Sequence, residues 1–322
     1  MIIGVESTAH TFGVGVCHKG KIRANVRDMY HPAIGGIIPI DAGKHHTAVA
    51  EKLWNQALRD AKITEKEIKG IAFSYAPGLA PCLLAGMQFV KAKANLLGIP
   101  VIPVHHSIAH LEIGQSLGAK DPVLLYASGA NTQIIAYAGQ RYRIFGETLD
   151  VGIGNCLDKI ARAMGFMFPG GPELEKLALK GMYHELKYSL KGMDVSFSGL
   201  QNQALQLRDK GMSPVDVACS VQETAFAMLV EASERALAHT GKKELVLGGG
   251  VACNARLQEM CRLMCTARGV ALFCPGKPLL VDNGAMIAYT GELLYKKKLF
   301  ISLDALDIAP RQRTDQVSVK WK

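Results

Sequence analysis

A pattern that occurs twice along the chain constrains the fold more than any other feature. An apolar strand, a short polar turn and a second apolar strand occupy Met1–Val5, residues 6–11 and Phe12–Cys17, and the same layout returns at Val123–Tyr126, residues 127–132 and Gln133–Tyr137. Small residues recur at matching places in the two turns: Ser7 with Ser128, Ala9 with Ala130 and Thr11 with Thr132. A repeated strand-turn-strand unit predicts an internally duplicated protein.

A second repeated unit supports the duplication. The strand Gly70–Tyr75 runs into Ala76-Pro77-Gly78 and the helix Pro81–Leu97. The strand Glu244–Leu247 runs into Gly248-Gly249-Gly250 and the helix Asn254–Ala267. Strands that alternate with helices favour an α/β fold. We therefore expect two related α/β domains that face each other across a cleft.

The repeats also set the domain boundaries. We expect an N-terminal lobe at residues 1–118, completed by a helix and tail at about 285–322, and a C-terminal lobe at 119–284 with an insertion near 182–211. Helical spacing of apolar residues predicts the remaining helices, and Thr64 with Glu67 forms a capping box. These helices are Lys44–Ala61, Asn155–Met164, Pro172–Lys180, Pro214–Thr240 with Ser213 as N-cap, and Asp282–Lys297.

Composition excludes several classes of protein. With 49% hydrophobic and 20% charged residues, the 322-residue chain is too apolar to be disordered. A net charge of +9 favours an acidic partner such as nucleic acid, although many enzymes carry a similar excess. The eight cysteines include no Cys-x-x-Cys pair, which predicts reduced, mostly buried thiols. The start lacks the features of a signal peptide, and no apolar run approaches the roughly 20 residues of a membrane span. We expect a cytoplasmic protein with no membrane partner.

Two histidines have the spacing of metal ligands. His106 and His110 are four residues apart, so on a helix both imidazoles lie on one face. The alternative is two ordinary core or surface histidines. The zincin pattern H-E-x-x-H is incomplete because Ser107 stands where the general-base glutamate is required.

Three turns that follow apolar strands have the composition of anion cradles, in which backbone N–H groups bind phosphate. They are Ser7-Thr8, Ser128–Asn131 and Gly248–Gly250. None fits the Walker A or G-x-G-x-x-G pattern. Carboxylates lie beside glycine or asparagine clusters at Asp158, Glu175 and Asp282. The alternative is that the first two are exposed helix charges and that Asp282 is an N-cap.

Seven motifs, in order, resemble those of the Kae/TsaD/Qri family, the catalytic subunit of tRNA threonylcarbamoyladenosine synthesis. The resemblance extends from residue 1 to the tail segment 313–317, and Ala9-His10 is similar to the archaeal and eukaryotic branch. The motifs lie at residues 6–11, 104–110, 128–133, 168–172, 196–200, 248–254 and 282–285.

The resemblance implies an actin-like ATPase (ASKHA) fold with two ribonuclease-H-like lobes around a central cleft. It implies transfer of the threonylcarbamoyl group from threonylcarbamoyl-AMP to N6 of the adenosine just 3′ of the anticodon in tRNAs reading ANN codons, with release of AMP. It also implies tRNA and the KEOPS subunits as partners, namely a small kinase/ATPase and two small accessory proteins. The implied cofactor is one iron ion per subunit, with zinc possible, and the ligand is an adenine nucleotide.

The family's site residues are carried over position by position. The implied metal ligands are His106, His110, Tyr126 and Asp282. As a hypothesis for the mechanism, the catalytic residues are His10, Ser128 and Gly129: backbone N–H groups of the Ser128–Ala130 turn stabilise the developing charge, and His10 deprotonates or positions N6. The alternative for His10 is a simple turn residue. The implied nucleotide-binding positions are Tyr126, Ala127, Ser128, Gly129, Ala130, Asp158, Gly171, Glu175 and Asn254.

Some positions depart from the family pattern. Ala76, Ala130 and Ala252 stand where glycine is common, so each requires a negative φ or accepts strain. Lysines at 91, 93 and 296–298 are candidates for tRNA phosphates, with solvated surface as the alternative. Two other functions remain open at this stage: a metalloendopeptidase, and a nucleotide- or nucleic-acid-binding scaffold without catalysis.

Overall fold

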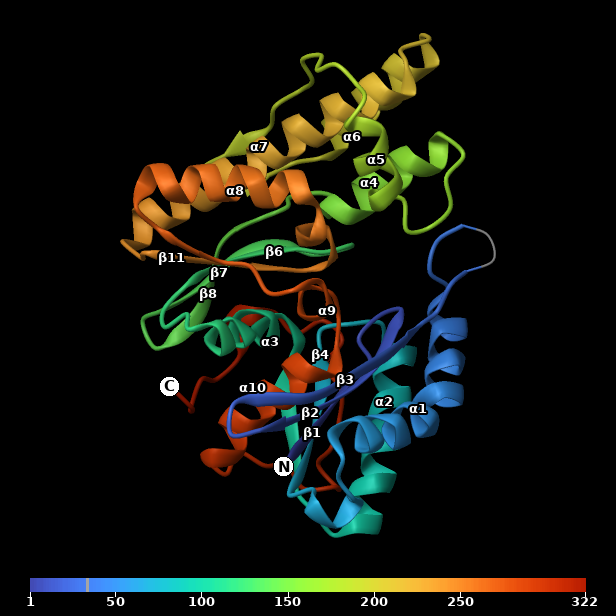
Figure 1. The fold of residues 1–322 in the computed structure, drawn as a ribbon, viewed down its shortest axis with the longest axis vertical. Coiled ribbons are helices and arrows are strands. Elements are labelled where there is room, and N and C mark those ends of the chain that lie inside the picture. Colours follow the sequence, from blue (N-terminus) through green and yellow to red (C-terminus); the bar gives the residue numbers. More distant parts are fainter. Residues whose placement is uncertain (33–34) are drawn as a thin grey trace. The chain divides into compact units, whose positions relative to one another are not determined.

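The computed structural model describes residues 1–32 and 35–322 and divides into two compact units. Unit 1 comprises Met1–Gly118, Gly139–Tyr142 and Val281–Lys322, and unit 2 comprises Ala119–Ala138 and Arg143–Leu280. Each unit is a mixed β-sheet with helices packed on it (Figure 1). The last boundary falls at Val281, so Asp282 belongs to unit 1, whereas the sequence analysis places it at the end of the second lobe.

Unit 1 contains a five-stranded sheet in the order β3-β2-β1-β4-β5. β1 pairs antiparallel with β2 and parallel with β4, and β4 pairs parallel with β5. β1 is buried along its whole length, which is why it reads as an apolar run instead of an alternating pattern. The strands are β1 (Ile2–Glu6), β2 (Thr11–His18), β3 (Lys21–Met29), β4 (Gly70–Ala76) and β5 (Val101–His105).

Helices cover both faces of this sheet. α1 and α2 pack together on one face, and α10 crosses the other face against β1, β2 and β4 (Figure 1). The approach of α10 is close because Gly4 and Gly15 have no side chain: a Cβ at Gly4 would lie 2.2 Å from the backbone nitrogen of Ala288. The elements are α1 (Pro39–Ala61), η1 (Glu65–Glu67), α2 (Ala80–Leu97), α3 (His106–Glu112), η2 (Ile113–Leu117), α10 (Gly284–Lys296) and η4 (Thr314–Gln316).

Unit 2 repeats the topology of unit 1. Its sheet has the order β12-β11-β6-β7-β8, in which β6 pairs antiparallel with β7 and parallel with β11. The predicted internal duplication is therefore confirmed: β6, β7 and β11 occupy the places of β1, β2 and β4. The strands are β6 (Val123–Ala127), β7 (Thr132–Ala138), β8 (Arg141–Glu147), β11 (Glu244–Gly248) and β12 (Ala271–Phe273).

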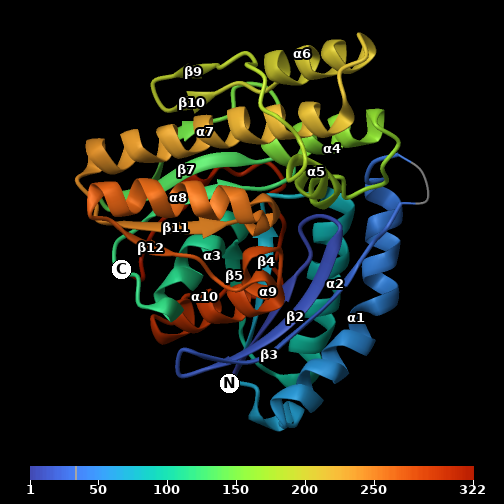
Figure 2. The same ribbon diagram turned by 45° about the horizontal axis from the view of Figure 1, so that its top comes forward.

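Long helices complete unit 2. α7 packs on β6 and β7 and lies beside α8 (Figure 2). The segment predicted as an insertion forms the hairpin β9 (Leu190–Lys191) and β10 (Asp194–Val195) and then α6, and its Phe197 and Leu200 are buried in the core of this unit. The helices are α4 (Ile153–Ala163), α5 (Gly171–Ala178), α6 (Ser198–Asp209), α7 (Pro214–Thr240), η3 (Gly250–Cys253), α8 (Ala255–Arg268) and α9 (Lys277–Leu280).

Capping residues and the spacing of apolar residues predict most helix boundaries to within a few residues, and the starts of two helices differ from the prediction. The capping box of Thr64 and Glu67 is present, and α7 begins after Ser213, although no cap bond from the Ser213 side chain forms. α1 begins at Pro39 instead of Lys44 because proline suits the first helical turn, where its missing N–H is not needed. α10 begins at Gly284 instead of Asp282. Within the described ranges, no helix is long and apolar enough to cross a membrane.

The structure also bears on the predicted environments of two cysteines on α8 and of Lys93 on α2. Cys261 and Cys265 are buried on α8, in agreement with the prediction of mostly buried thiols, and burial raises the pKa of Cys265 to about 11. Lys93 is not a solvated lysine: its Nζ lies 2.9 Å from Glu51 and 3.2 Å from Glu65, and over the ring of Trp54. Lys93 therefore links α2 to α1 through ion pairs, and its ammonium group is not available to a tRNA phosphate.

Candidate active site

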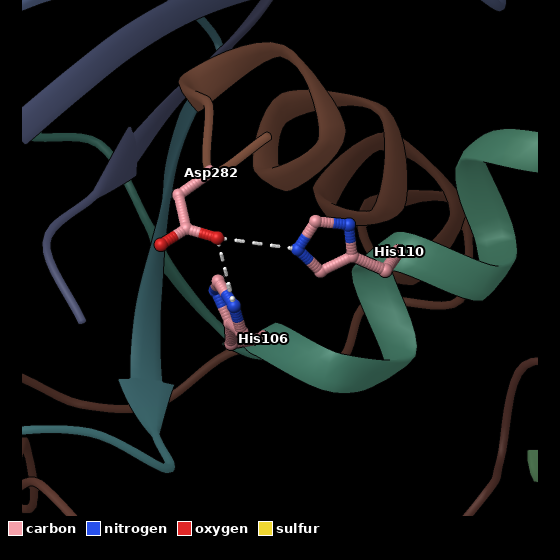
Figure 3. Close-up of side chains that lie close together, drawn as sticks. All are labelled: His106, His110 and Asp282. Carbon is pink, nitrogen blue, oxygen red and sulfur yellow. Dashed lines mark ion pairs between the residues drawn. The ribbon is translucent and has the colours of Figure 1, made fainter. Parts of the chain in front are cut away.

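Two histidines and an aspartate meet at one edge of the sheet in unit 1. α3 follows β5 without a loop, so His106 and His110 lie one turn apart on the same helix face. Asp282 lies just before α10 and points between them, and its Oδ1 is 3.4 Å from Nε2 of each imidazole (Figure 3). The three ligand atoms lie within 4.8 Å of one another. The predicted pair of imidazoles on one helix face is confirmed.

Asn283, and not Asp282, caps α10. Its Oδ1 accepts a hydrogen bond of 2.9 Å from the backbone N–H of Met286, and its Nδ2 donates to the carbonyl of Val281 at 2.7 Å. The alternative in which Asp282 serves as the N-cap is therefore wrong. With the cap supplied by the neighbouring residue, the Asp282 carboxylate faces the histidines.

Sequence reasoning missed a second carboxylate behind the first histidine. Glu6, at the end of β1, is fully buried, and its Oε2 lies 2.9 Å from Nδ1 of His106. Its Oε1 accepts from the backbone N–H of Thr8 at 2.7 Å and from the Thr8 hydroxyl at 2.5 Å. A carboxylate that accepts from Nδ1–H leaves the lone pair of Nε2 directed toward Asp282. The signal in the sequence is an acidic residue at the end of an otherwise apolar strand.

The charge states suit a cation site. Burial opposes ionisation of Asp282, but His106 and His110 lower its pKa well below the usual value. Burial also lowers the pKa of His110, against the opposing effect of Asp282, so the imidazole favours its neutral form. A neutral imidazole and an ionised carboxylate are the forms in which these residues bind metals.

The donor set fits a transition metal. In residues 1–32 and 35–322, His106, His110 and Asp282 are the one cluster of three or more histidine, cysteine or acidic side chains with ligand atoms this close. Two imidazoles and one carboxylate match the ligands of non-haem iron and of catalytic zinc. The hydrogen bond from Glu6 adds the carboxylate-histidine pairing that orients metal-binding imidazoles.

The proposed catalytic histidine lies nearby in the same unit. His10 is half-buried in the turn between β1 and β2, and its carbonyl accepts a hydrogen bond of 2.8 Å from the backbone N–H of Tyr30. The buried His46 ring lies beneath this turn, packs on Phe12, and has His10 and Ala9 among the groups that influence its pKa. The catalytic role of His10 stays a prediction.

The glycine turns of unit 2 lie together at the carboxyl ends of parallel strands. The turn after β6 is closed by the Ser128 N–H, which donates 2.9 Å to the carbonyl of Asn131, and by the Ser128 hydroxyl, which donates to the same carbonyl. The Ser128 N–H thus donates inside the turn. The predicted role of the backbone N–H groups of Ser128, Gly129 and Ala130 in stabilising charge on a substrate stays a prediction.

The turn after β11 requires glycine. Gly249 has φ of +92°, and a Cβ there would lie 2.2 Å from the carbonyl oxygen of Ala127. The two turns are therefore in backbone contact, which forms a cradle that a side chain would fill. Ala130 and Ala252, which replace common glycines of the family, have no positive φ, so neither position is strained.

Two carboxylates predicted to bind nucleotide also hold the backbone of unit 2. Asp158 on α4 is half-buried and accepts from the N–H of Gly170 at 2.7 Å, beside Gly171 at the start of α5. Glu175 accepts from the N–H of Ala255 at 2.7 Å. The alternative of exposed helix charges is therefore wrong for both, because each fixes a turn next to a helix N-terminus.

Asn254 caps α8 and is nearly buried. Its Oδ1 accepts from the N–H groups of Arg256 and Leu257, and its Nδ2 donates to Gln222 at 2.9 Å. Tyr126 and Ala127 are buried at the end of β6. Tyr126 belongs to unit 2, whereas His106, His110 and Asp282 belong to unit 1. Its assignment as a further metal ligand stays a prediction, as do the nucleotide roles of Ala127, Ser128, Gly171 and Asn254.

Comparison with known proteins decides the family. The family model of TsaD, described as tRNA N6-adenosine threonylcarbamoyltransferase, matches residues 21–289. The chain belongs to this family.

Relatives in the TsaD family match over the whole chain. A tRNA N6-adenosine threonylcarbamoyltransferase of Thermococcus kodakarensis is 48% identical over 321 residues, which is 99% of each chain. A probable bifunctional tRNA threonylcarbamoyladenosine biosynthesis protein of Methanosarcina mazei is 49% identical over 325 residues, which cover 99% of this chain and 59% of that protein. The first name describes an acyltransferase and the second a protein of tRNA threonylcarbamoyladenosine biosynthesis, and the family resemblance seen in the motifs is confirmed.

Solved structures confirm the fold of this TsaD-family chain. HypF of T. kodakarensis has a TM-score of 0.65 at 15% identity, over 94% of this chain and 49% of HypF. The activator of 2-hydroxyisocaproyl-CoA dehydratase from Clostridium difficile, with bound ADPNP, has a TM-score of 0.55 at 11% identity, over 94% of this chain and 98% of the activator. At these identities the similarity shows the fold alone, and it confirms the predicted ASKHA class.

Proposed function

We propose that the chain transfers the threonylcarbamoyl group from threonylcarbamoyl-AMP to N6 of the adenosine just 3′ of the anticodon in tRNAs reading ANN codons, and releases AMP. The observation that carries the proposal is the buried cluster of His106, His110 and Asp282 with Glu6 behind His106. The family relatives named as threonylcarbamoyltransferases support the choice of reaction.

We assign the cluster to iron, with zinc as the alternative, held by Nε2 of His106, Nε2 of His110 and a carboxylate oxygen of Asp282. A metal bound here supplies Lewis acidity toward oxygens of the threonylcarbamoyl group. Glu6 fixes the tautomer of His106 through its Oε2, and Thr8 in turn holds the other oxygen of Glu6, Oε1, through its N–H and hydroxyl. This chain of hydrogen bonds prepares the imidazole before any ligand arrives.

Unit 2 supplies the groups for the adenylate. We assign the N–H groups of Gly129 and Ala130 and the cradle at Gly249, at the ends of β6 and β11, to the phosphate oxygens. Asp158 and Glu175 each accept one backbone hydrogen bond, and a carboxylate has capacity for more, so both can also accept from ribose hydroxyls. Asn254, at the start of α8, is assigned to the adenine.

The reaction requires one proton transfer. N6 of the adenosine forms a bond to the carbamoyl carbon, the bond from that carbon to the phosphate oxygen breaks, and AMP leaves with the electron pair. The proton lost from N6 passes to a base. We assign this base to the imidazole of His10, which is half-buried on the turn between β1 and β2.

The partners proposed are tRNA and the KEOPS subunits, a small kinase/ATPase and two small accessory proteins. The outer faces of α1 and α2 carry exposed apolar side chains at Ile40, Leu84 and Leu96. Apolar residues on the outside of a helix pair are suited to protein partners. The +9 net charge suits the tRNA.

The test is transfer of labelled threonine to tRNA by the metal-loaded chain with its partner subunits, supplied with threonylcarbamoyl-AMP. We expect His106→Ala and Asp282→Asn to lose bound metal and transfer together. His184→Ala is the matched control, because His184 is an exposed histidine of unit 2 with a side chain 44% accessible. Full transfer by a metal-free Asp282→Asn variant would disprove the metal's role, and labelling of a tRNA with guanosine at the target position would disprove the acceptor.

A further inference from the structure

Unit 1 contains a cavity that the proposed function does not use. Its volume is about 390 Å³, and it lies between α3, α10 and the segment after residue 311. His105, the last residue of β5, and Ile108 of α3 line it, whereas His106 and His110 of α3 face Asp282. The cavity and the metal-ligand cluster therefore share α3 but use different residues of it.

The walls of the cavity are largely apolar. Ile108, Leu294, Phe300 and Trp321 line it. Ligand pockets in proteins commonly have volumes of about 300–1,000 Å³ and apolar walls with a few polar groups. A single water molecule takes up about 30 Å³ of liquid, so this space far exceeds the room that one bridging water needs.

Among residues 1–32 and 35–322, three polar atoms in its lining find no hydrogen-bond partner: Nδ1 of His105, Oγ1 of Thr290 and Oε1 of Gln312. His105 and Thr290 are 3% and 1% exposed. Nε2 of His105 lies 3.3 Å from the carbonyl oxygen of Gln312, and a carbonyl can only accept, so Nε2 carries the proton. Nδ1 is then an acceptor, and so is the Gln312 oxygen. Buried acceptors without donors are costly, which favours a ligand that donates.

We propose that this cavity binds a small molecule with an aromatic or aliphatic ring and a hydroxyl or amino donor. The ring packs between Ile108, Leu294 and Phe300, and the donor reaches Nδ1 of His105 or Oε1 of Gln312. The ligand is distinct from the adenylate and the tRNA of the proposed function. On α3 it contacts Ile108, and not His106 or His110, which are the proposed metal ligands.

Phenol and its methyl ether anisole form a matched pair of probes, since both have the ring and phenol alone has the donor. Binding to the full-length chain is measured by titration calorimetry and located by soaking crystals. We expect phenol to bind at one site in the cavity and anisole to bind about tenfold more weakly or worse, because anisole leaves the buried acceptor unsatisfied. Equal binding of the two probes contradicts the proposal, and so does a cavity that holds ordered water alone at saturating phenol.

Variants assign the binding to this cavity. Ser318→Trp places a large ring at an exposed lining position, where folding is tolerant, and should abolish phenol binding. Leu263→Trp, at a residue 62% exposed on α8, is the matched control and should bind phenol as the wild type does. Thr290→Val removes a hydroxyl at constant shape and should alter phenol affinity by less than the loss in Ser318→Trp. Unchanged phenol binding by Ser318→Trp places the probe elsewhere and overturns the proposal.

Discussion

Replacing Glu6 with glutamine tests whether the buried carboxylate prepares His106 for a metal. The substitution keeps the shape of the side chain but gives one end an amide NH₂. If that end faces Nδ1 of His106, 2.9 Å away, two donors oppose each other, and relief requires Nδ1 to lose its proton and Nε2 to gain one. If the amide flips, its NH₂ meets the N–H of Thr8, 2.7 Å away. Either orientation loses one buried hydrogen bond.

The first orientation removes the lone pair that the metal needs on Nε2 of His106. Loss of such an orienting partner lowers metal affinity by about 10- to 100-fold, or about 1.4–2.7 kcal/mol of binding free energy. We expect Glu6→Gln to raise the Kd for Fe²⁺ or Zn²⁺ by this factor. The assay is competitive titration of metal-free protein against a chromophoric chelator, with Fe²⁺ handled without oxygen.

The matched control is Glu292→Gln. Glu292 is also buried in unit 1, but its oxygens accept from the backbone N–H groups of Lys19 and Gly20 at the turn between β2 and β3. This variant should lose stability and keep its metal affinity. A Kd for Glu6→Gln within about twofold of the wild type, in protein that binds one metal per chain, would refute the role of Glu6.

Three further predictions concern the framework of the two units. Asn283→Ala removes the cap of α10 and should lower the free energy of unfolding by about 1–2 kcal/mol in urea denaturation, since the bond to Met286 is lost; an unchanged midpoint contradicts it. Gly249→Ala should destabilise the protein by about 1–3 kcal/mol or prevent folding, whereas Gly250→Ala, where a Cβ meets nothing within 4 Å, should be close to neutral; thermal denaturation of both variants decides. Burial, and to a lesser extent His45, lowers the pKa of His46 from 6.5 to about 4. Between these pH values the unfolded chain binds a proton that the folded chain does not. The free energy of unfolding therefore falls as the pH drops from about 6.5 to about 4. The loss is about 3 kcal/mol at most, and His46→Gln should remove it, as measured by urea denaturation across that range; an identical pH dependence in the variant contradicts the assignment.

The fold was predictable because both copies of the duplicated unit have the same local sequence pattern. Apolar strands followed by small polar turns mark β1 with β2 and β6 with β7, and the pairs have the same topology in both sheets. Helix starts were less predictable, since Pro39 begins α1 within a stretch whose apolar pattern is weak. The role of Asn283 as the cap, in place of Asp282, depends on which of two adjacent polar side chains points along the helix, and spacing does not encode this.

The candidate site was predictable in part. Spacing alone placed His106 and His110 on one helix face, and the family resemblance added Asp282. Glu6 was missed because its contact with His106 joins the ends of β1 and β5, strands that are separated in the sheet by β4. The backbone contacts of Asp158 and Glu175 were missed for a similar reason. Asp158 contacts Gly170 across the turn between α4 and α5, and Glu175 contacts Ala255, which is distant in sequence. The periodicity of apolar residues predicts neither contact.

The central claim is that His106, His110 and Asp282 bind the metal on which threonylcarbamoyl transfer depends. The most direct measurement is an anomalous-scattering map, recorded at the iron edge and then the zinc edge, from crystals of the chain purified without added metal. The account predicts one peak bonded to Nε2 of both imidazoles and to a carboxylate oxygen of Asp282. A map with no peak there after loading with either metal, in protein that still transfers threonylcarbamoyl to tRNA, would contradict it.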